Sequence, residues 1–568
     1  MTNGEEKRLR VSSTRLWTFL RWGGVGLAVL AVAALALDLT VRGVLDTDTV
    51  EHRLDQALDE ATDGRYQLTI DDVGWGFLAQ SLRVEGATVR PDSQSGEQKK
   101  GRRPLPRQIR ASASSVHLQD IGTWALLWRR ALRLDAVRVR APRVAIRTRD
   151  VPEMQRQEGQ AKTEDATGDG SRISSLHVRQ FRIEDGTLTR GPLNRPPRDS
   201  LWGLSVRLDS LAADSVAKVA SPQFLAARFS EGAFDGFRQL TPSGPYEFQL
   251  GPSRVSRQDS VLSVQDAHYA PPVSDTAFMR RQKYRANRFR TGAARVAVAG
   301  FDYRRFVEDG ALHAARVRVD TMTLDVYRDN HLPPQPKDPP PPMPQDAVER
   351  LNRSLRIDTL RVRGGEIRYT KRSEGVPESG AIWFEDLRAN LHNVTNDSAR
   401  MTPSTPLVLE ARTRVNGAGL LRTTWRIPLL APHLELDFEG QLGAMDVRAF
   451  NDTFVPLSGI RVESGQVDSL WFQADVKRGT AKGSLHSIYR NLEVEMLNEA
   501  TGERNLGSRL KTVVAGLALR PKNVPGEGDM HTGRIEHEHS ADATFFKFLW
   551  KSVRSGIYSL VGIDRLPR

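Results

Sequence analysis

For most of its length the chain alternates apolar and polar residues with a period of two. The alternation starts after residue 64, and its first examples are Leu68 and Ile70, Leu82 and Val84, and Ala87 and Val89. Successive side chains of a β-strand point to opposite faces of the sheet, so the pattern predicts strands with one apolar and one polar face. We therefore expect a mostly β protein built on an antiparallel sheet with one dry face.

A strand unit recurs in which short stretches of alternation are separated by two-residue slips. It runs through Leu176, Val178, Phe181, Ile183, Gly186 and Leu188, again through Leu355, Ile357, Leu360, Val362, Gly365, Ile367 and Tyr369, and a third time from Ile460 to Phe472. A slip turns side chains to the other face unless a bulge absorbs it, and glycine suits such a corner. The recurrence predicts stacked units of an extended array. The alternative is chance similarity among ordinary amphipathic strands.

Short helices are expected beside these strands. Three of them would open at an aspartate with an aromatic residue four positions later: Asp120 and Trp124, Asp302 and Phe306, and Asp446 and Phe450. Aspartate is a favoured N-cap because its carboxylate accepts hydrogen bonds from the first free amides of a helix. A longer amphipathic helix is predicted before the first strand, with one apolar face made of Val50, Leu54, Ala57, Leu58 and Ala61.

The N-terminal region contains an uncharged, membrane-type segment from Trp22 to Leu37. Its apolar residues include Trp22, Val25, Leu27, Leu30, Leu35 and Leu37. A bilayer core requires about 20 apolar residues, so we predict a transmembrane anchor at residues 22–41. Basic residues precede the segment and acidic residues follow it, which predicts a cytoplasmic N-terminus at 1–21 and an exported remainder. The alternative is a cleaved signal peptide, because Ala34-Leu35-Ala36 has the small-x-small form that signal peptidase reads.

Polar segments divide the remainder of the chain. Residues 92–106 and 150–171 are rich in Gly, Gln, Lys and Glu, and they predict surface loops. Residues 332–346 include the sequence PPQPKDPPPPMP, which favours a stiff polyproline-like spacer. We therefore predict an N-terminal β-block at 46–331, this spacer, and a C-terminal β-block at 347–540.

The last segment, residues 541–568, changes from strand to helical spacing. Its apolar positions include Phe545, Phe548, Leu549 and Ile557, flanked by basic residues. A basic amphipathic helix of this kind can lie on a membrane surface. It can equally cover an exposed sheet, and we favour this second role because the polar face is poorly defined.

Composition and charge add a preference for anionic surfaces. Of 568 residues, 39% are hydrophobic and 27% charged, which is typical of a folded protein, and the net charge is +13. The arginines are scattered along the predicted strands. They are expected either to form a solvated outer face of the sheet or to attract anionic lipid headgroups. We expect no nucleic-acid partner, because no basic recognition helix is evident. The absence of cysteine agrees with an exported bacterial protein without disulfides.

No convincing catalytic motif is present, and we expect neither enzymatic activity nor a cofactor. Nucleophile-elbow, zinc-protease and phosphate-loop sequences do not occur in a credible context. His531, His537 and His539 surround Glu536 and Glu538, a composition that could hold a metal ion. The same stretch alternates like an exposed strand, which we prefer to a metal site.

Three stretches resemble the AsmA-like family of bacterial envelope proteins. They are VEHRLDQALDEATDGRYQLTIDDVGWGF followed by SLRVEGATV, then IGTWALLWRRALRLDAVRVRAPRVAI, then LELDFEGQLGAMDVRAFNDTFVPLSGIRVESGQVDSLWF. The resemblance implies a long, curved antiparallel β-groove with an apolar inner face, anchored in the inner membrane and projecting into the periplasm. It also implies kinship with bridge-like proteins that carry phospholipid between membranes.

The expected function is therefore phospholipid binding and transfer along an apolar groove, in support of outer-membrane biogenesis. The candidate groove-facing residues are Leu176, Val178, Leu355, Ile357, Leu360 and Val362. Acyl chains suit such a face because their burial is favourable and non-directional, about 0.8 kcal/mol per methylene. Expected partners are phospholipid, the inner membrane, and an outer-membrane or envelope protein. The alternatives are a non-transporting envelope scaffold that regulates outer-membrane protein insertion, for which the same residues would form a closed core, and an envelope enzyme with the histidine cluster as its metal site.

Overall fold

The computed structural model describes Glu51, His52, Asp55, Leu58 and residues 65–563, except for 77–79, 93–106, 123–130, 150–174, 214–221, 242–244, 335–339, 352, 374–377, 403, 498–512 and 515–516. The predicted anchor at 22–41, with Trp22, Val25, Leu27, Leu30, Leu35 and Leu37, lies outside the described residues, as do 93–106 and 150–171. Within the described ranges, no helix has both the length and the apolarity needed to cross a bilayer.

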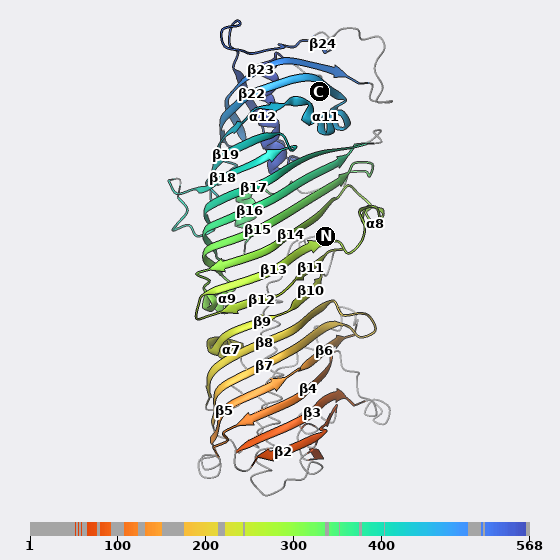
Figure 1. The fold of residues 1–568 in the computed structure, drawn as a ribbon, viewed down its shortest axis with the longest axis vertical. Helices are drawn as coiled ribbons and strands as arrows, with labels where there is room; N and C mark the ends of the chain where they lie inside the picture. The colour runs from red at the N-terminus through yellow and green to blue at the C-terminus, as the bar shows by residue number, and fades with distance from the viewer. Residues whose placement is uncertain are drawn as a thin grey trace, which may run out of the picture. The chain divides into compact units, whose positions relative to one another are not determined.

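The protein is mostly β, as the alternation predicts, and 24 described strands belong to one hydrogen-bonded sheet (Figure 1). The chain divides into two compact units. Unit 1 comprises residues 1–242, 249–262 and 303–310, and unit 2 comprises residues 243–248, 263–302 and 311–568.

Unit 1 is built from short and long strands with two small helices. Its elements are β1 (Tyr66–Thr69), β2 (Asp72–Gly76), β3 (Ser81–Pro91), β4 (Arg107–Gln119), β5 (Ala131–Arg140), β6 (Arg143–Thr148), β7 (Ser175–Pro192), β8 (Asp199–Ala213), α7 (Pro222–Arg228), β9 (Phe229–Phe234), β10 (Gly236–Leu240), β12 (Ser253–Ser256) and α9 (Tyr303–Asp309).

Unit 2 holds most of the remaining strands and the C-terminal helices. Its elements are β11 (Glu247–Leu250) and β13 (Val261–Ala270), which both straddle the boundary, then α8 (Asp275–Arg280), β14 (Asn287–Ala299), β15 (Leu312–Asp329), α10 (Pro344–Glu349), β16 (Leu355–Arg372), β17 (Ser379–Thr395), β18 (Leu407–Val415), β19 (Gly419–Ile427), β20 (Leu436–Leu442), β21 (Met445–Asp446), η3 (Val447–Phe450), α11 (Asn451–Ser458), β22 (Ile460–Lys477), β23 (Thr480–Met496), β24 (Val513–Val514), β25 (Leu517–Ala518), β26 (Gly533–Glu538) and α12 (Phe545–Val561). The predicted C-terminal helix is thus present as α12.

The expectation of a wholly antiparallel sheet is wrong, because the sheet is mixed. Strand β7 pairs in parallel with both β5 and β6, and β15 pairs in parallel with β16 over fifteen residue pairs from Leu312–Leu355 to Asp329–Arg372. A parallel pair needs a long crossover connection, whereas an antiparallel pair closes with a short turn. The segments that the composition marks as loops serve as these connections: 149–174 joins β6 to β7, and the Pro-rich stretch with α10 joins β15 to β16.

The predicted corners within the strands are confirmed. The register between β7 and β8 shifts around Gly186, and the register between β16 and β17 shifts around Gly365. Beside the second shift, Gly364 has φ +69°, a left-handed conformation that glycine adopts at little cost. These bulges let apolar residues before and after a slip face the same side.

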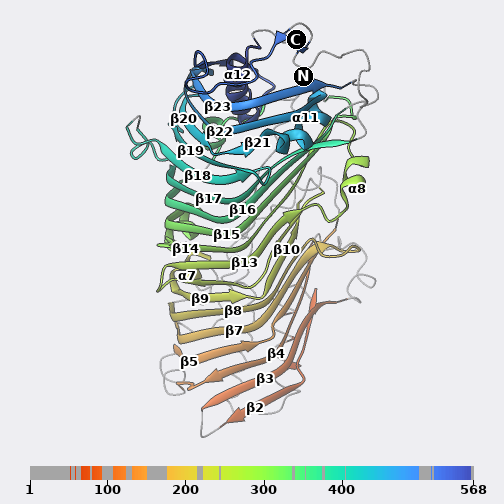
Figure 2. The same cartoon turned by 45° about the horizontal axis from the view of Figure 1, so that its top comes forward.

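One apolar core cluster lies in each unit. The unit 1 cluster includes Leu82, Leu118, Leu134, Val137 and Phe181, with Phe224 of α7 and Tyr303 of α9 packed against it. The unit 2 cluster includes Phe438, Leu485, Ile535 and Phe548, the last from α12. Figure 2 shows α11 and α12 at the same end of unit 2, beside β20–β23. Asp446 caps η3 as predicted, since its carboxylate accepts the Arg448 amide at 2.9 Å.

Candidate functional site

The six candidate groove residues fall in two different environments. Leu176 and Val178 belong to the unit 1 core cluster, where they are 3% and 0% exposed. The other four lie on β16 of unit 2, where Ile357 and Val362 are buried and Leu355 and Leu360 are half-buried. In the described part of the chain, these four residues are members of neither core cluster.

A continuous apolar row crosses the strands of unit 2 through Leu360. The strand registers place the following residues side by side on eight strands, from β14 to β22: Val298, Val317, Leu360, Leu391, Leu409, Trp425, Phe438 and Ala474. Cross-strand neighbours of this kind lie within about 5 Å of one another. The row shows that the apolar faces of the individual strands join into one surface within unit 2.

Beyond the bulges, the same strands carry a second apolar surface that we call the apolar strip. It consists of seven residues on β14–β17: Phe289, Leu324, Val326, Ile367, Tyr369, Ile382 and Phe384. Phe289 is 39% exposed, and the other six are half-buried. None of the seven belongs to either core cluster of the described residues. The strip therefore presents apolar area that the two cores do not use.

Cationic side chains gather at one end of the apolar strip. Lys371 follows Tyr369 on the same face of β16, and Arg328 lies opposite Lys371 on β15. Burial lowers the pKa of Lys371, and the charges of Arg328, Lys547 and Arg285 lower it further. Burial also raises the pKa of the Tyr369 hydroxyl. A hydrophobic surface with several cations at its end has the polarity of a binding site for an anionic amphiphile.

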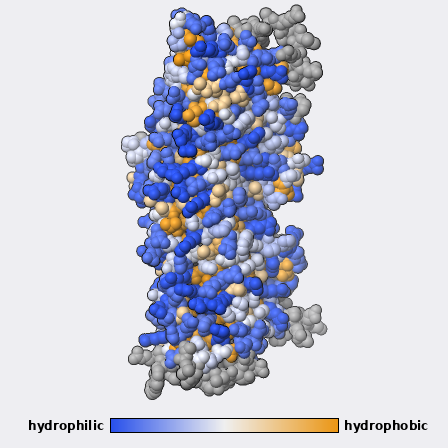
Figure 3. Space-filling view, viewed as in Figure 1, coloured by the Kyte–Doolittle hydropathy of each residue, from blue (hydrophilic) through white to orange (hydrophobic). Residues whose placement is uncertain are grey.

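The opposite face of the same strands is polar and carries a row of arginines. Arg388, Arg412 and Arg422 lie directly opposite one another on β17, β18 and β19. The row continues through Gln441, Trp471 and His486. Hydrophilic side chains also predominate on the face seen in Figure 3. The row lines an open trough of about 1010 Å³ on unit 2.

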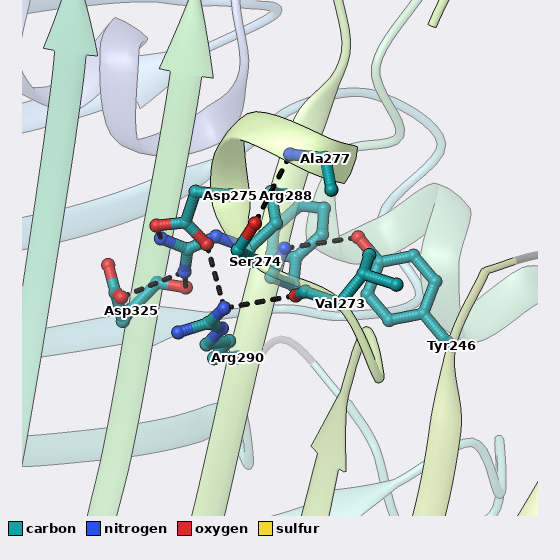
Figure 4. A network of polar contacts seen from close by, with 9 residues as sticks. Tyr246, Val273, Ser274, Asp275, Ala277, Arg288, Arg290 and Asp325 are labelled. Carbon is teal, nitrogen blue, oxygen red and sulfur yellow. Dashed lines mark hydrogen bonds and ion pairs between the residues drawn. The ribbon is translucent and has the colours of Figure 1, made fainter. Parts of the chain in front are cut away.

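A buried arginine organises the polar face next to α8 (Figure 4). The Arg288 side chain is 3% exposed and forms ion pairs with Asp275 at 2.7 Å and Asp325 at 2.8 Å. Arg290 pairs with the other carboxylate oxygen of Asp275 at 2.9 Å. These ion pairs hold α8 against β14 and β15. Their role is therefore to stabilise the fold.

The histidine cluster does not assemble into a metal site in the described part of the chain, where no three His, Asp or Glu side chains converge. The His537 ring stacks near Phe548, with centroids 5.9 Å apart, and the His539 ring meets Phe548 edge-on at 5.5 Å. Burial and the nearby charges of Lys551 and Arg554 lower the pKa of His537. Both rings thus pack on α12.

The four apolar residues singled out on the C-terminal helix face the sheet. Phe545, Phe548 and Leu549 are buried in the unit 2 cluster, and Ile557 packs against it half-buried. Thr544 caps the helix by accepting the Lys547 amide at 3.4 Å, and Gly562 ends it with φ +88°. Phe546 and Trp550 point outward, with 69% and 38% exposure.

Sequence reasoning missed both the apolar strip and the arginine row as assembled surfaces. Each member is visible as one position of an alternating strand, but the register that aligns them depends on pairings between distant segments. No protein-family model and no curated protein matches this chain.

Proposed function

We propose that the protein binds phospholipid on the apolar face of unit 2, and that it handles this lipid in a bacterial envelope from an inner-membrane anchor at residues 22–41. The observation that carries the proposal is the apolar strip, seven apolar side chains aligned over four strands outside both core clusters. Soluble surfaces seldom leave contiguous apolar patches of several hundred Å² uncovered. Acyl chains would cover this one.

The charges at the end of the strip support an anionic headgroup over a neutral one. Burial lowers the Lys371 pKa most, and repulsion by the nearby charges of Arg328, Lys547 and Arg285 lowers it further. A phosphate bound between them would relieve this repulsion and accept charge-assisted hydrogen bonds. Acyl chains on the strip would then extend away from these cations across β14–β17.

Transfer, as distinct from storage, is supported by the purely hydrocarbon side chains of six of the seven strip residues, Tyr369 with its hydroxyl being the exception. Apolar contact is non-directional and proportional to area, so an acyl chain is stabilised at each position along the rows. The transverse row through Leu360 would continue the path from β14 toward β19, where Trp425 meets α12. On this proposal, phospholipid moves along these rows, and its movement supports outer-membrane biogenesis.

Site-specific photocrosslinking tests lipid binding directly. A photoreactive phenylalanine analogue replaces Phe384, on the strip, in the full chain expressed in bacterial cells. The matched control replaces Trp383, whose ring lies under Arg368 on the opposite face. After irradiation, the protein is digested and lipid adducts are identified by mass spectrometry.

We expect phospholipid adducts at position 384 and none at position 383. Equal labelling at both positions would reduce the result to non-specific membrane contact. The absence of lipid adducts at both positions, together with adducts to another protein at 384, would favour the scaffold alternative.

A further inference from the structure

The arginine row on the polar face of unit 2 is an unusual arrangement of like charges. Arg388 pairs in register with Arg412, and Arg412 pairs in register with Arg422. All three side chains are exposed. Like charges directly opposite each other on adjacent strands are destabilising, so the fold itself gains nothing from this row.

Nearby arginines form ion pairs, whereas these three form none within the described part of the chain, although Glu410 and Glu439 also line the trough. Arg426 pairs with Glu439 at 3.4 Å, and Arg356 pairs with Asp358 at 3.2 Å. Among the described residues, Arg388, Arg412 and Arg422 have no ion pair and no side-chain hydrogen bond. Their guanidinium groups are therefore available to an external anion.

The row lies in a trough with an aromatic end. The trough has a volume of about 1010 Å³ and includes all three arginines. Beyond Gln441, the row reaches Trp471, whose ring stacks on His486 with centroids 5.4 Å apart. Trp471 is 42% exposed, so part of a large aromatic ring is open two strands away from Arg422.

We infer that this trough is a binding site for a ligand that carries two or more clustered phosphate groups and a flat ring. Guanidinium groups match phosphate oxygens in a bidentate geometry. Neighbouring strands place the three groups at intervals of about 4.8 Å, which suits consecutive phosphates better than a single one. The exposed part of Trp471 would stack on the ring. The trough lies on the face opposite the apolar strip, so the inference is independent of the proposed lipid function.

Titration calorimetry on the full chain in detergent tests the site with tripolyphosphate as the probe. Arg412→Gln, at the centre of the row, should weaken binding by about tenfold or more because it removes a charge-assisted pair. The matched control is Arg414→Gln, an exposed arginine on the same strand and face that lies outside the trough. This control should change the affinity less than about twofold.

The contribution of the ligand's flat ring is tested by comparing a diphosphate that carries a ring with one that does not. Adenosine diphosphate should bind more tightly than pyrophosphate, and Trp471→Ala should remove this preference while leaving pyrophosphate affinity unchanged. A stability measurement excludes misfolding: Arg412→Gln should leave the unliganded melting temperature unchanged or higher, yet abolish the rise that tripolyphosphate produces.

The source of the phosphates is decided with vesicles. Binding to phosphatidylglycerol vesicles but not to the soluble probes, lost in Arg412→Gln, would assign the row to lipid phosphates and overturn the ring-bearing ligand. Binding of the soluble probes with the expected variant pattern supports the inference. Equal effects of Arg412→Gln and Arg414→Gln, or no binding of any probe, would overturn it.

Discussion

Trp425 of β19 packs edge-on against Phe545 of α12, with ring centroids 5.8 Å apart. Trp425 is also a member of the apolar row that runs through Leu360 and Leu409. The helix therefore contacts this row at Trp425 of β19, while the apolar strip on β14–β17 lies outside the core that the helix completes. This division separates the part of the apolar face that stabilises unit 2 from the part assigned to a ligand.

Truncation of a buried side chain where α12 packs on the sheet should strongly lower the stability of unit 2. Phe548 is fully buried in the unit 2 cluster, so Phe548→Ala should lower the free energy of unfolding by about 3–5 kcal/mol. Phe546 is the matched control on the same helix, since it is 69% exposed. Urea denaturation should find Phe546→Ala within about 0.5 kcal/mol of the parent protein. Equal losses in the two variants would contradict the placement of α12.

The close approach of α12 to the sheet depends on paired glycines. A Cβ atom at Gly533 would lie 2.0 Å from the Gly556 carbonyl oxygen, which is backbone and cannot move aside. We expect Gly533→Ala to destabilise unit 2 by about 1–3 kcal/mol through overpacking. At Gly443 the nearest atom would be at 3.7 Å, so Gly443→Ala serves as the control and should be nearly neutral in the same denaturation experiment.

The buried Arg288 should reveal its dependence on two carboxylates. Asp275 and Asp325 each form an ion pair with it, and Arg288 itself is almost fully buried. Removing one carboxylate leaves the other in place, whereas Asp275→Ala with Asp325→Ala leaves an uncompensated buried charge. The double variant should lose about 3–5 kcal/mol, more than the two single losses added together. Strict additivity in a double-mutant cycle would argue against a shared network.

The strands were predictable because their alternation is local. A period of two needs only neighbouring residues, and the glycines at 186 and 365 marked the corners correctly. Parallel pairing of β15 with β16 was not predictable, since the alternation of a strand is the same in either direction. The pairing partner and register are fixed by contacts between segments far apart in sequence.

The same limit explains why the candidate surfaces were only partly anticipated. Leu360 and Val362 were identified as apolar-face residues from their own strand, but Arg412 was one of many scattered arginines. Its significance arises from Arg388 and Arg422 on the two adjacent strands. Burial also depends on what packs above a strand, so Val178 in a closed core and Leu360 in an open row looked alike in sequence.

Tyr489 should control part of the alkaline stability of unit 2. It is 4% exposed, its hydroxyl donates to the Arg520 carbonyl oxygen at 3.1 Å, and burial raises its pKa from 10.0 to about 12. Because the folded-state pKa is the higher one, the stabilisation is complete below pH 10 and is lost as the pH rises toward 12. Tyr489→Phe removes the hydroxyl, so it should cost about 1 kcal/mol at neutral pH through the lost hydrogen bond. The variant should then lose less stability than the parent protein between pH 10 and 12. Urea denaturation across this range measures the difference between the variant and the parent protein, and identical pH slopes for the two would contradict the raised pKa.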